Sequence, residues 1–133
     1  MNPNILYPMF VTSKLTQVYD FYAKKLGWEV VFDIDRYKQF RQREGGPELA
    51  FATTAASEPL GVDVAEFEGR GVVVSVPVTN PDAEHERLRE AGLQPSSAPS
   101  DKPWGCRSFT IADPTGVQLE FFMEKAEGAK ASA

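Results

Sequence analysis

Few side chains of this chain could take part in catalysis, since its 133 residues include one cysteine and one histidine. Cys106 lies at the start of an expected strand, and a thiol nucleophile needs a base such as histidine beside it. His85 falls between two glutamates in the middle of an expected helix, on a face that should be solvated. We therefore interpret Cys106 as a bystander or buried thiol. A single cysteine also excludes an internal disulfide and a zinc site built from several thiolates.

The short segment Pro103-Trp104-Gly105 is a stronger candidate for contact with a ligand. Proline and glycine hold Trp104 at the mouth of an expected hairpin, where the indole offers a rigid stacking surface. Each aromatic partner contributes about 0.5 to 1.5 kcal/mol beyond its area burial. The same side chain could instead fill the core or a subunit interface, and the sequence leaves both interpretations open.

Composition and charge narrow the classes of function. Hydrophobic residues make up 42 % and charged residues 25 % of the chain, as in a typical packed globular domain. The formal net charge is −5 and the basic residues are spread evenly, so a nucleic-acid partner is not expected. The amino end lacks a signal-peptide pattern, and no apolar run reaches the roughly 18 residues of a membrane span. We expect a single cytoplasmic domain over residues 1–133, with no membrane partner.

The apolar spacing of the first half predicts a strand, a helix and three more strands. Thr12 and Ser13 offer a hydroxyl cap for the helix, and Gly27 supplies its left-handed end. The turn Gly45-Gly46-Pro47 separates the last two strands. The four strands are expected at residues 5–11, 28–33, 36–43 and 48–53.

The same order of elements returns in the second half. Asn80 and Pro81 should begin a helix that Gly92 ends, and Asp113-Pro114-Thr115-Gly116 has the residues of a type I turn. Strands are expected at 71–78, 106–112 and 117–123, with a short extended piece near Leu93 and a loop over 95–103. Residues 55–70 lack a clear period and are interpreted as a linker, and the tail 125–133 should fray.

The halves also repeat each other in sequence. Val11-Thr12-Ser13 precedes a helix and then Leu26-Gly27-Trp28; Val78-Thr79-Asn80 precedes a helix and then Ala91-Gly92-Leu93. The period is about 65 residues. An internal repeat of this kind indicates two copies of one βαβββ module.

This repeat resembles the vicinal oxygen chelate superfamily of glyoxalases, bleomycin resistance proteins and extradiol dioxygenases. Asp20-Phe21-Tyr22 leading to Leu26-Gly27-Trp28, and Asp113-Pro114-Thr115-Gly116 leading to Leu119-Glu120-Phe121, carry the resemblance. It covers residues 5–123 and implies an α+β fold of two tandem βαβββ modules forming a cupped mixed sheet. The modules are expected at residues 5–54 and 71–124.

Metal-dependent members of that superfamily take ligands, typically histidine or glutamate, from the first and last strands of each module. The resemblance places these positions at Leu6 or Tyr7 and Glu48 or Ala50 in the first module, and at Val73 and Glu120 in the second. At best two carboxylates and a phenol remain in the set, with no imidazole, and Glu120 alone does not hold a transition metal against water. We expect neither a metal nor another cofactor.

Metal-free members that resemble bleomycin resistance proteins bind a drug in an aromatic groove at a dimer interface. Pro103-Trp104-Gly105 followed by Arg107 and Phe109 resembles the Pro-Trp-Gly segment of those proteins. The resemblance thus implies a homodimer that binds a small molecule and sequesters a drug or metabolite. Aromatic side chains on the strands could line the cupped sheet, although each is more simply explained as part of the hydrophobic core. The candidate ligand contacts are Trp104, Arg107, Phe109, Glu120, Tyr37, Phe40, Phe51 and Tyr7, with Phe32 and Phe122 as further strand aromatics.

Two other functions stay open from the sequence. An enzyme of lyase, isomerase or dioxygenase-like type would use Glu120 as base or metal ligand, although no residue is firmly catalytic. Without catalysis, Glu120 is expected to be a buried carboxylate paired with Arg107 or a tyrosine. A regulatory or structural dimer would fill the cup with side chains and leave no accessible pocket.

Overall fold

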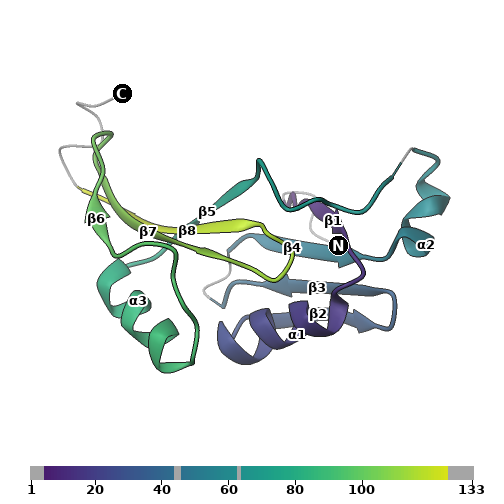
Figure 1. Cartoon of the computed structure of the whole chain (residues 1–133), viewed down its shortest axis with the longest axis horizontal. Helices are drawn as coiled ribbons and strands as arrows, with labels where there is room; N and C mark the ends of the chain where they lie inside the picture. Colours follow the sequence, from purple (N-terminus) through teal and green to yellow (C-terminus); the bar gives the residue numbers. More distant parts are fainter. Residues whose placement is uncertain (1–4, 44–45, 63, 126–133) are drawn as a thin grey trace. The chain divides into compact units, whose positions relative to one another are not determined.

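The computed structural model describes residues 5–43, 46–62 and 64–125 of the chain (Figure 1). The chain divides into two compact units, Met1–Arg70 and Gly71–Ala133. Each unit has one four-stranded mixed sheet and one main helix, which confirms the predicted α+β fold of two tandem modules. No helix in the described ranges is long and apolar enough to cross a bilayer.

The first unit is built on the sheet β1-β4-β3-β2. Its strands are β1 (Met9–Val11), β2 (Glu29–Ile34), β3 (Tyr37–Arg41) and β4 (Glu48–Ala52). β1 runs parallel to β4, and the other neighbours are antiparallel.

Helix α1 (Leu15–Tyr19) begins the helical segment of this unit, and a π-helical stretch η1 (Asp20–Lys25) completes it. The wide turn is visible in the bond from the Leu26 amide to the Phe21 carbonyl, five residues back, at 2.8 Å. Gly27 ends the segment at φ 73°, as its type predicts. The expected hydroxyl cap was wrong in detail, because Thr12 accepts a bond from the Lys14 amide before the helix and α1 itself has no side-chain cap.

The second unit repeats this plan in the order β5-β8-β7-β6. Its elements are β5 (Val73–Pro77), α3 (Pro81–Glu90), β6 (Ser100–Asp101), β7 (Cys106–Ala112) and β8 (Gln118–Glu124). Asn80 caps α3 by accepting a bond from the Ala83 amide at 3.1 Å, as the sequence predicts.

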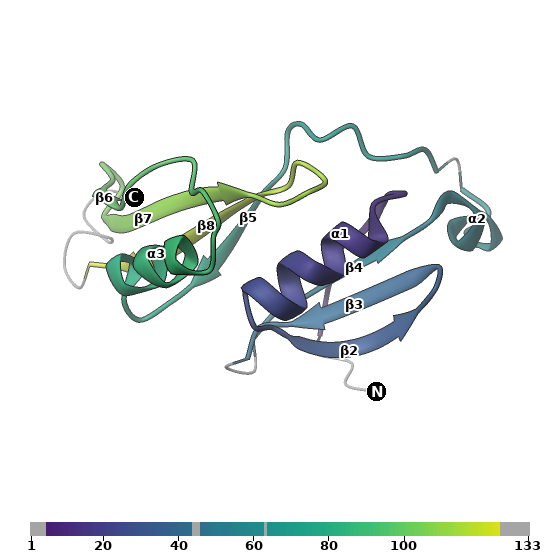
Figure 2. The same ribbon diagram turned by 60° about the horizontal axis from the view of Figure 1, so that its bottom comes forward.

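Each helix packs on one face of its own sheet: α1 contacts β3 and β4, and α3 contacts β7 and β8 (Figure 2). We call the face of each sheet turned away from its helix the open face. Side chains alternate between the two faces along a strand. The register of the strands therefore decides which residues a ligand on the open face could touch.

The segment between the modules is more structured than the sequence indicates. Residues 55–70 are not a plain linker, because α2 (Thr54–Ser57) and the 3-10 turn η2 (Glu58–Leu60) occupy its start. Farther along, Phe67 donates a backbone bond to Val11 and its ring packs 5.2 Å from that of Phe10. Tertiary packing on β1 thus orders a stretch that has no periodic signal.

Three strand expectations were wrong. The first strand was expected over residues 5–11, but it begins only at Met9. The short extended piece near Leu93 is not a strand; β6 instead lies inside the expected loop 95–103, where it pairs with β7. In β2 the expected alternation breaks at a bulge, since Val30 pairs with Phe40 but Phe32 pairs with Gln39. One extra residue turns the following side chains to the other face.

Candidate functional site

The open face of the second sheet centres on Glu120. Glu120 in β8 pairs with Ser75 in β5 and with Thr110 in β7, so all three side chains share this face. The hydroxyls of Ser75 and Ser108 each donate a hydrogen bond to one carboxylate oxygen of Glu120, both at 2.9 Å. The carboxylate is therefore held in one orientation by two neutral donors, and Arg107 and the tyrosines are not its partners.

A hollow of about 210 Å³ surrounds this carboxylate. Its lining residues come from three strands and the turn before β7: Ser75, Trp104, Cys106, Glu120, Phe122 and Glu124. Trp104 is 56 % exposed, so its indole forms an accessible wall and does not fill the core. Drug-sized pockets typically run from about 300 Å³ upward. The hollow of this unit therefore fits a fragment-sized group or one part of a larger ligand.

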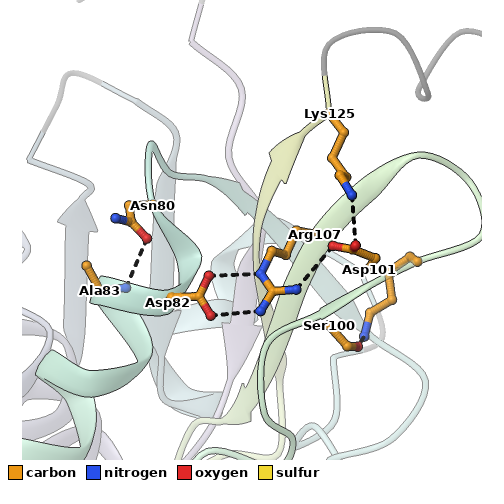
Figure 3. Close-up of polar contacts among 8 residues, drawn as sticks. Asn80, Asp82, Ala83, Ser100, Asp101, Arg107 and Lys125 are labelled. Carbon is orange, nitrogen blue, oxygen red and sulfur yellow. Dashed lines mark hydrogen bonds and ion pairs between the residues drawn. The ribbon is translucent and has the colours of Figure 1, made fainter.

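Arg107, a candidate ligand contact, is occupied elsewhere. Its guanidinium donates to both carboxylate oxygens of Asp82 in α3, at 2.8 and 2.9 Å, and to Asp101 in β6 at 3.1 Å (Figure 3). Lys125 also binds Asp101, at 2.7 Å. Because Arg107 lies on the helix side of β7, the predicted contact with Glu120 was wrong.

This ion-pair cluster shifts the acidity of its members. The hydrogen bond from Arg107 holds the pKa of the Asp82 carboxyl below its usual value. Lys125 first and Arg107 second lower the pKa of Asp101, and the two carboxylates raise the pKa of Arg107. The cluster joins α3, β6 and β7, which indicates a structural role.

Three of the candidate aromatics lie in the cores of the two units. Phe40, Phe51 and Phe109 are each 0 % exposed. Phe40 and Phe51 pack 5.4 and 5.3 Å from the Tyr22 ring, and Phe109 stacks on Phe121 at 5.3 Å. These side chains fill the space between sheet and helix, so a ligand on an open face would not touch them.

His85 also lies against this core. Its ring packs edge-on to Phe109 at 5.0 Å. The expectation of a solvated helix face is only partly met, since His85 is half-buried. The contact gives the imidazole a packing role, on the face of the sheet opposite to the hollow.

The remaining candidates, Tyr7 and Tyr37, lie in the first unit. Tyr37 donates to the side-chain oxygen of Gln39 at 2.7 Å, and Gln39 in turn donates to Glu48. Arg41 binds the other oxygen of Glu48 at 3.0 Å. Burial and then the neighbouring Tyr7 hydroxyl raise the pKa of Tyr37. The structure thus groups these residues in a hydrogen-bonded chain on the open face of the first sheet.

The strand register shows which side chains face the candidate metal-ligand positions. Glu120 faces Ser75, and Val73 faces Gln118 two residues earlier on the same strands. Ala50 faces Met9, while Glu48 is bound by Gln39 and Arg41. The choice between Leu6 and Tyr7, and between Glu48 and Ala50, stays a prediction. No group of three histidine, cysteine or acidic side chains lies together within residues 5–43, 46–62 and 64–125.

Several residues of the hollow were missed by sequence reasoning. Glu124 lies two and four positions after Phe122 and Glu120, so strand alternation alone would have placed all three on one face. Ser75 is the polar residue in the apolar run 71–78, which is a signal of an open-face contact. For Ser108, which bonds Glu120 without lining the hollow, the sequence holds no comparable signal.

Comparisons with known proteins agree with the fold and with the repeat. The profile of the Glyoxalase/Bleomycin resistance protein/Dioxygenase superfamily matches residues 4–121. A crystal structure of a glyoxalase/bleomycin resistance protein/dioxygenase from Nocardioides is 30 % identical and matches with a TM-score of 0.76, over 96 % of this chain and 87 % of that one. No curated protein matches the chain.

Two more distant structures share the fold. A superfamily member from Sphaerobacter thermophilus DSM 20745 is 22 % identical, with a TM-score of 0.72 over 93 % of this chain and 99 % of that one. TnmS3, an antibiotic binding protein from Streptomyces sp. CB03234, is 20 % identical, with a TM-score of 0.70 over 93 % and 98 %. With its profile match, paired βαβββ modules and strand register, the chain belongs to the glyoxalase/bleomycin resistance protein/dioxygenase superfamily.

Proposed function

We propose that the protein binds a small molecule on the open face of its second sheet, in the hollow between Trp104 and Glu120, and sequesters it without chemical change. The observation that carries this proposal is an exposed indole beside a carboxylate that two serines hold in place. A rigid aromatic wall and a few fixed polar groups are what small-molecule sites commonly combine.

The family supports the proposal at a coarser level. The superfamily includes bleomycin resistance proteins, and TnmS3, which shares the fold, is an antibiotic binding protein. A drug or a metabolite of similar chemistry is therefore the class of ligand to test first.

The donor set supports binding without a resident metal. Among the candidate ligand positions the carboxylates are Glu120, whose two oxygens accept bonds from serines, and Glu48, which accepts bonds from Gln39 and Arg41. An open catalytic metal site normally uses about three protein ligands. We therefore assign no step to a metal.

Replacing the indole tests the proposal directly. Trp104→Ala should weaken binding of any ligand that occupies the hollow by at least about tenfold, since it removes the stacking surface. Ligands are found first by screening bleomycin and other aromatic antibiotics, and affinities are measured by calorimetry. Because Trp104 is half exposed, the thermal unfolding midpoint should change little. Unchanged affinity for every ligand found would contradict the proposal.

A base-catalysed lyase or isomerase is the alternative function, and one observation favours it. Within the part of the chain that the structure describes, Glu120 forms no ion pair, so its carboxylate is available to accept a substrate proton. Glu120→Gln would then abolish turnover of a bound ligand while leaving much of its binding. A ligand recovered unchanged after prolonged incubation with the wild-type protein favours sequestration.

A further inference from the structure

We propose that the ligand of this hollow is a cation that carries a hydrogen-bond donor, such as an amidinium or protonated amine, attached to a flat apolar group. The inference rests on the proposed function and adds the chemical class of the ligand. It follows from two carboxylates, Glu120 and Glu124, and two aromatic rings, Trp104 and Phe122, that line one hollow of about 210 Å³.

Among the described residues of the second unit, no lysine or arginine lines this hollow to balance its charge. The described lysines and arginines of the second unit have partners elsewhere: Arg87 with Glu84, Arg89 with Glu86, Lys102 with Ser100, Arg107 with Asp82 and Asp101, and Lys125 with Asp101. None of these cations is among the lining residues of the hollow. Two carboxylates at a partly enclosed surface therefore attract a cation more strongly than in open water.

The hydrogen bonding of Glu120 is also incomplete. An ionised carboxylate offers about four lone-pair sites, and the two serines use one bond on each oxygen. Both serines are neutral donors, so they orient the carboxylate without cancelling its charge. A ligand with paired N–H donors can complete this set, and charge-assisted bonds of that kind are the stronger ones.

The aromatic walls favour a cation of a particular shape. Cations bind over the faces of aromatic rings, tryptophan best of all. Trp104 is exposed and Phe122 is half-buried on the same face of the sheet. A flat cationic head group would therefore meet ring faces and carboxylates together, and the volume of the hollow suits a head group more than a whole drug.

A matched set of fragments tests this inference. Benzamidine is a flat cation, benzamide is its neutral counterpart, and benzoate is the corresponding anion. Binding to the full chain is measured by NMR titration of the two indole N–H signals, since Trp28 is buried at 6 % exposure and Trp104 is accessible. We expect benzamidine to bind at least about tenfold more tightly than benzamide, and benzoate to bind more weakly than either.

Variants show whether the preference comes from these carboxylates. Glu120→Gln and Glu124→Gln should each reduce the ratio of benzamidine to benzamide affinity by at least about threefold. Glu90→Gln removes the same charge from α3, on the side of the sheet opposite to the hollow, and should leave the ratio unchanged. Glu124 is exposed, so its variant stays informative if Glu120→Gln disturbs the serine contacts.

The outcomes separate the two proposals. Equal or tighter binding of benzamide or benzoate at Trp104 would overturn the cation inference but leave a binding function, and would indicate that a cation from another part of the chain or a second copy balances the carboxylates. Absence of benzamidine binding would also overturn the cation inference. The proposed function itself would be contradicted only if no screened ligand lost affinity in Trp104→Ala.

Discussion

At the scale of single residues, the second unit uses its charges in two separate ways on the two faces of one sheet. Arg107 binds two aspartates on the helix side, and the lowered pKa of each aspartate comes from its cationic partners. Among the described residues, the printed partners of Glu120 on the open side are two serine hydroxyls. The charges of the first arrangement are paired, whereas the carboxylate of the second has neutral donors.

Replacing Arg107 should lower stability in a pH-dependent way. Asp82 and Asp101 have lower pKa values in the folded chain than in the unfolded chain. Their ion pairs with Arg107 therefore stabilise the fold fully when the pH is above the unfolded-state pKa of about 4. This stabilisation is lost as the pH falls through the lower folded-state pKa values. Arg107→Met should therefore unfold at a lower temperature than wild type at neutral pH. The two midpoints should converge below about pH 4.

Thermal melts followed by circular dichroism across this pH range provide the measurement. Lys102→Met is the matched control, because Lys102 donates to the Ser100 hydroxyl and to no carboxylate in the described residues. Its difference from wild type should show no such convergence. A pH-independent loss in Arg107→Met would mean that the side chain acts by packing alone.

At the scale of elements, strand alternation divides the aromatic residues into core and site. Phe109 and Phe121 point toward α3, while Phe122 lies on the open face, one residue farther along β8. In the first unit, the bulge in β2 brings Phe32 to the face of Tyr37, at 5.9 Å between ring centroids. The face that a ring occupies therefore matters more than its presence on a strand.

A pair of truncations tests this division. Phe109→Ala should cost about 3 to 5 kcal/mol of unfolding free energy, because it removes a fully buried ring. Phe122→Ala should cost clearly less and should weaken ligand binding instead. Urea unfolding measures the first effect and calorimetry the second. Similar costs for both, with affinity intact in Phe122→Ala, would mean that the assignment of the open face is wrong.

At the scale of the whole molecule, each of the two units has an open face with exposed apolar side chains. The homodimer stays a prediction that rests on the resemblance to bleomycin resistance proteins. The first open face exposes apolar side chains as the second does, with Phe32 at 52 % and Val73 at 62 % exposure. Exposed apolar surface of this kind is typical of sites for ligands or partners.

Native mass spectrometry of protein purified without chelator or added metal tests the number of subunits, the bound metal and any bound ligand in one experiment. We expect a dimer without a stoichiometric divalent ion, because the candidate ligand positions offer at most two carboxylates and no imidazole. A co-purified small molecule, lost in Trp104→Ala, would identify the ligand. A dimer that carries one divalent ion per site would contradict the metal-free proposal and favour the enzyme.

The sequence by itself determined the repeat, the family and most of the strands. Periodic apolar residues and turn formers such as Gly27 and Asp113-Pro114-Thr115-Gly116 are local signals, and each depends on backbone conformation within a few residues. The hairpin of β7 and β8 was predicted to within one residue at each end. The sequence also drew attention to Trp104 and Glu120, which the structure brings together.

Only the tertiary structure decided which residues surround Glu120. The register of β5 against β8 places Ser75, and not Val73, opposite Glu120, and that of β1 against β4 places Ala50 opposite Met9. Both pairings are parallel and join strands far apart in the chain, so no local pattern encodes them. A shift of one residue exchanges the two faces of a strand, which is why Phe40, Phe51 and Phe109 belong to the core while Ser75, Phe122 and Glu124 line the hollow.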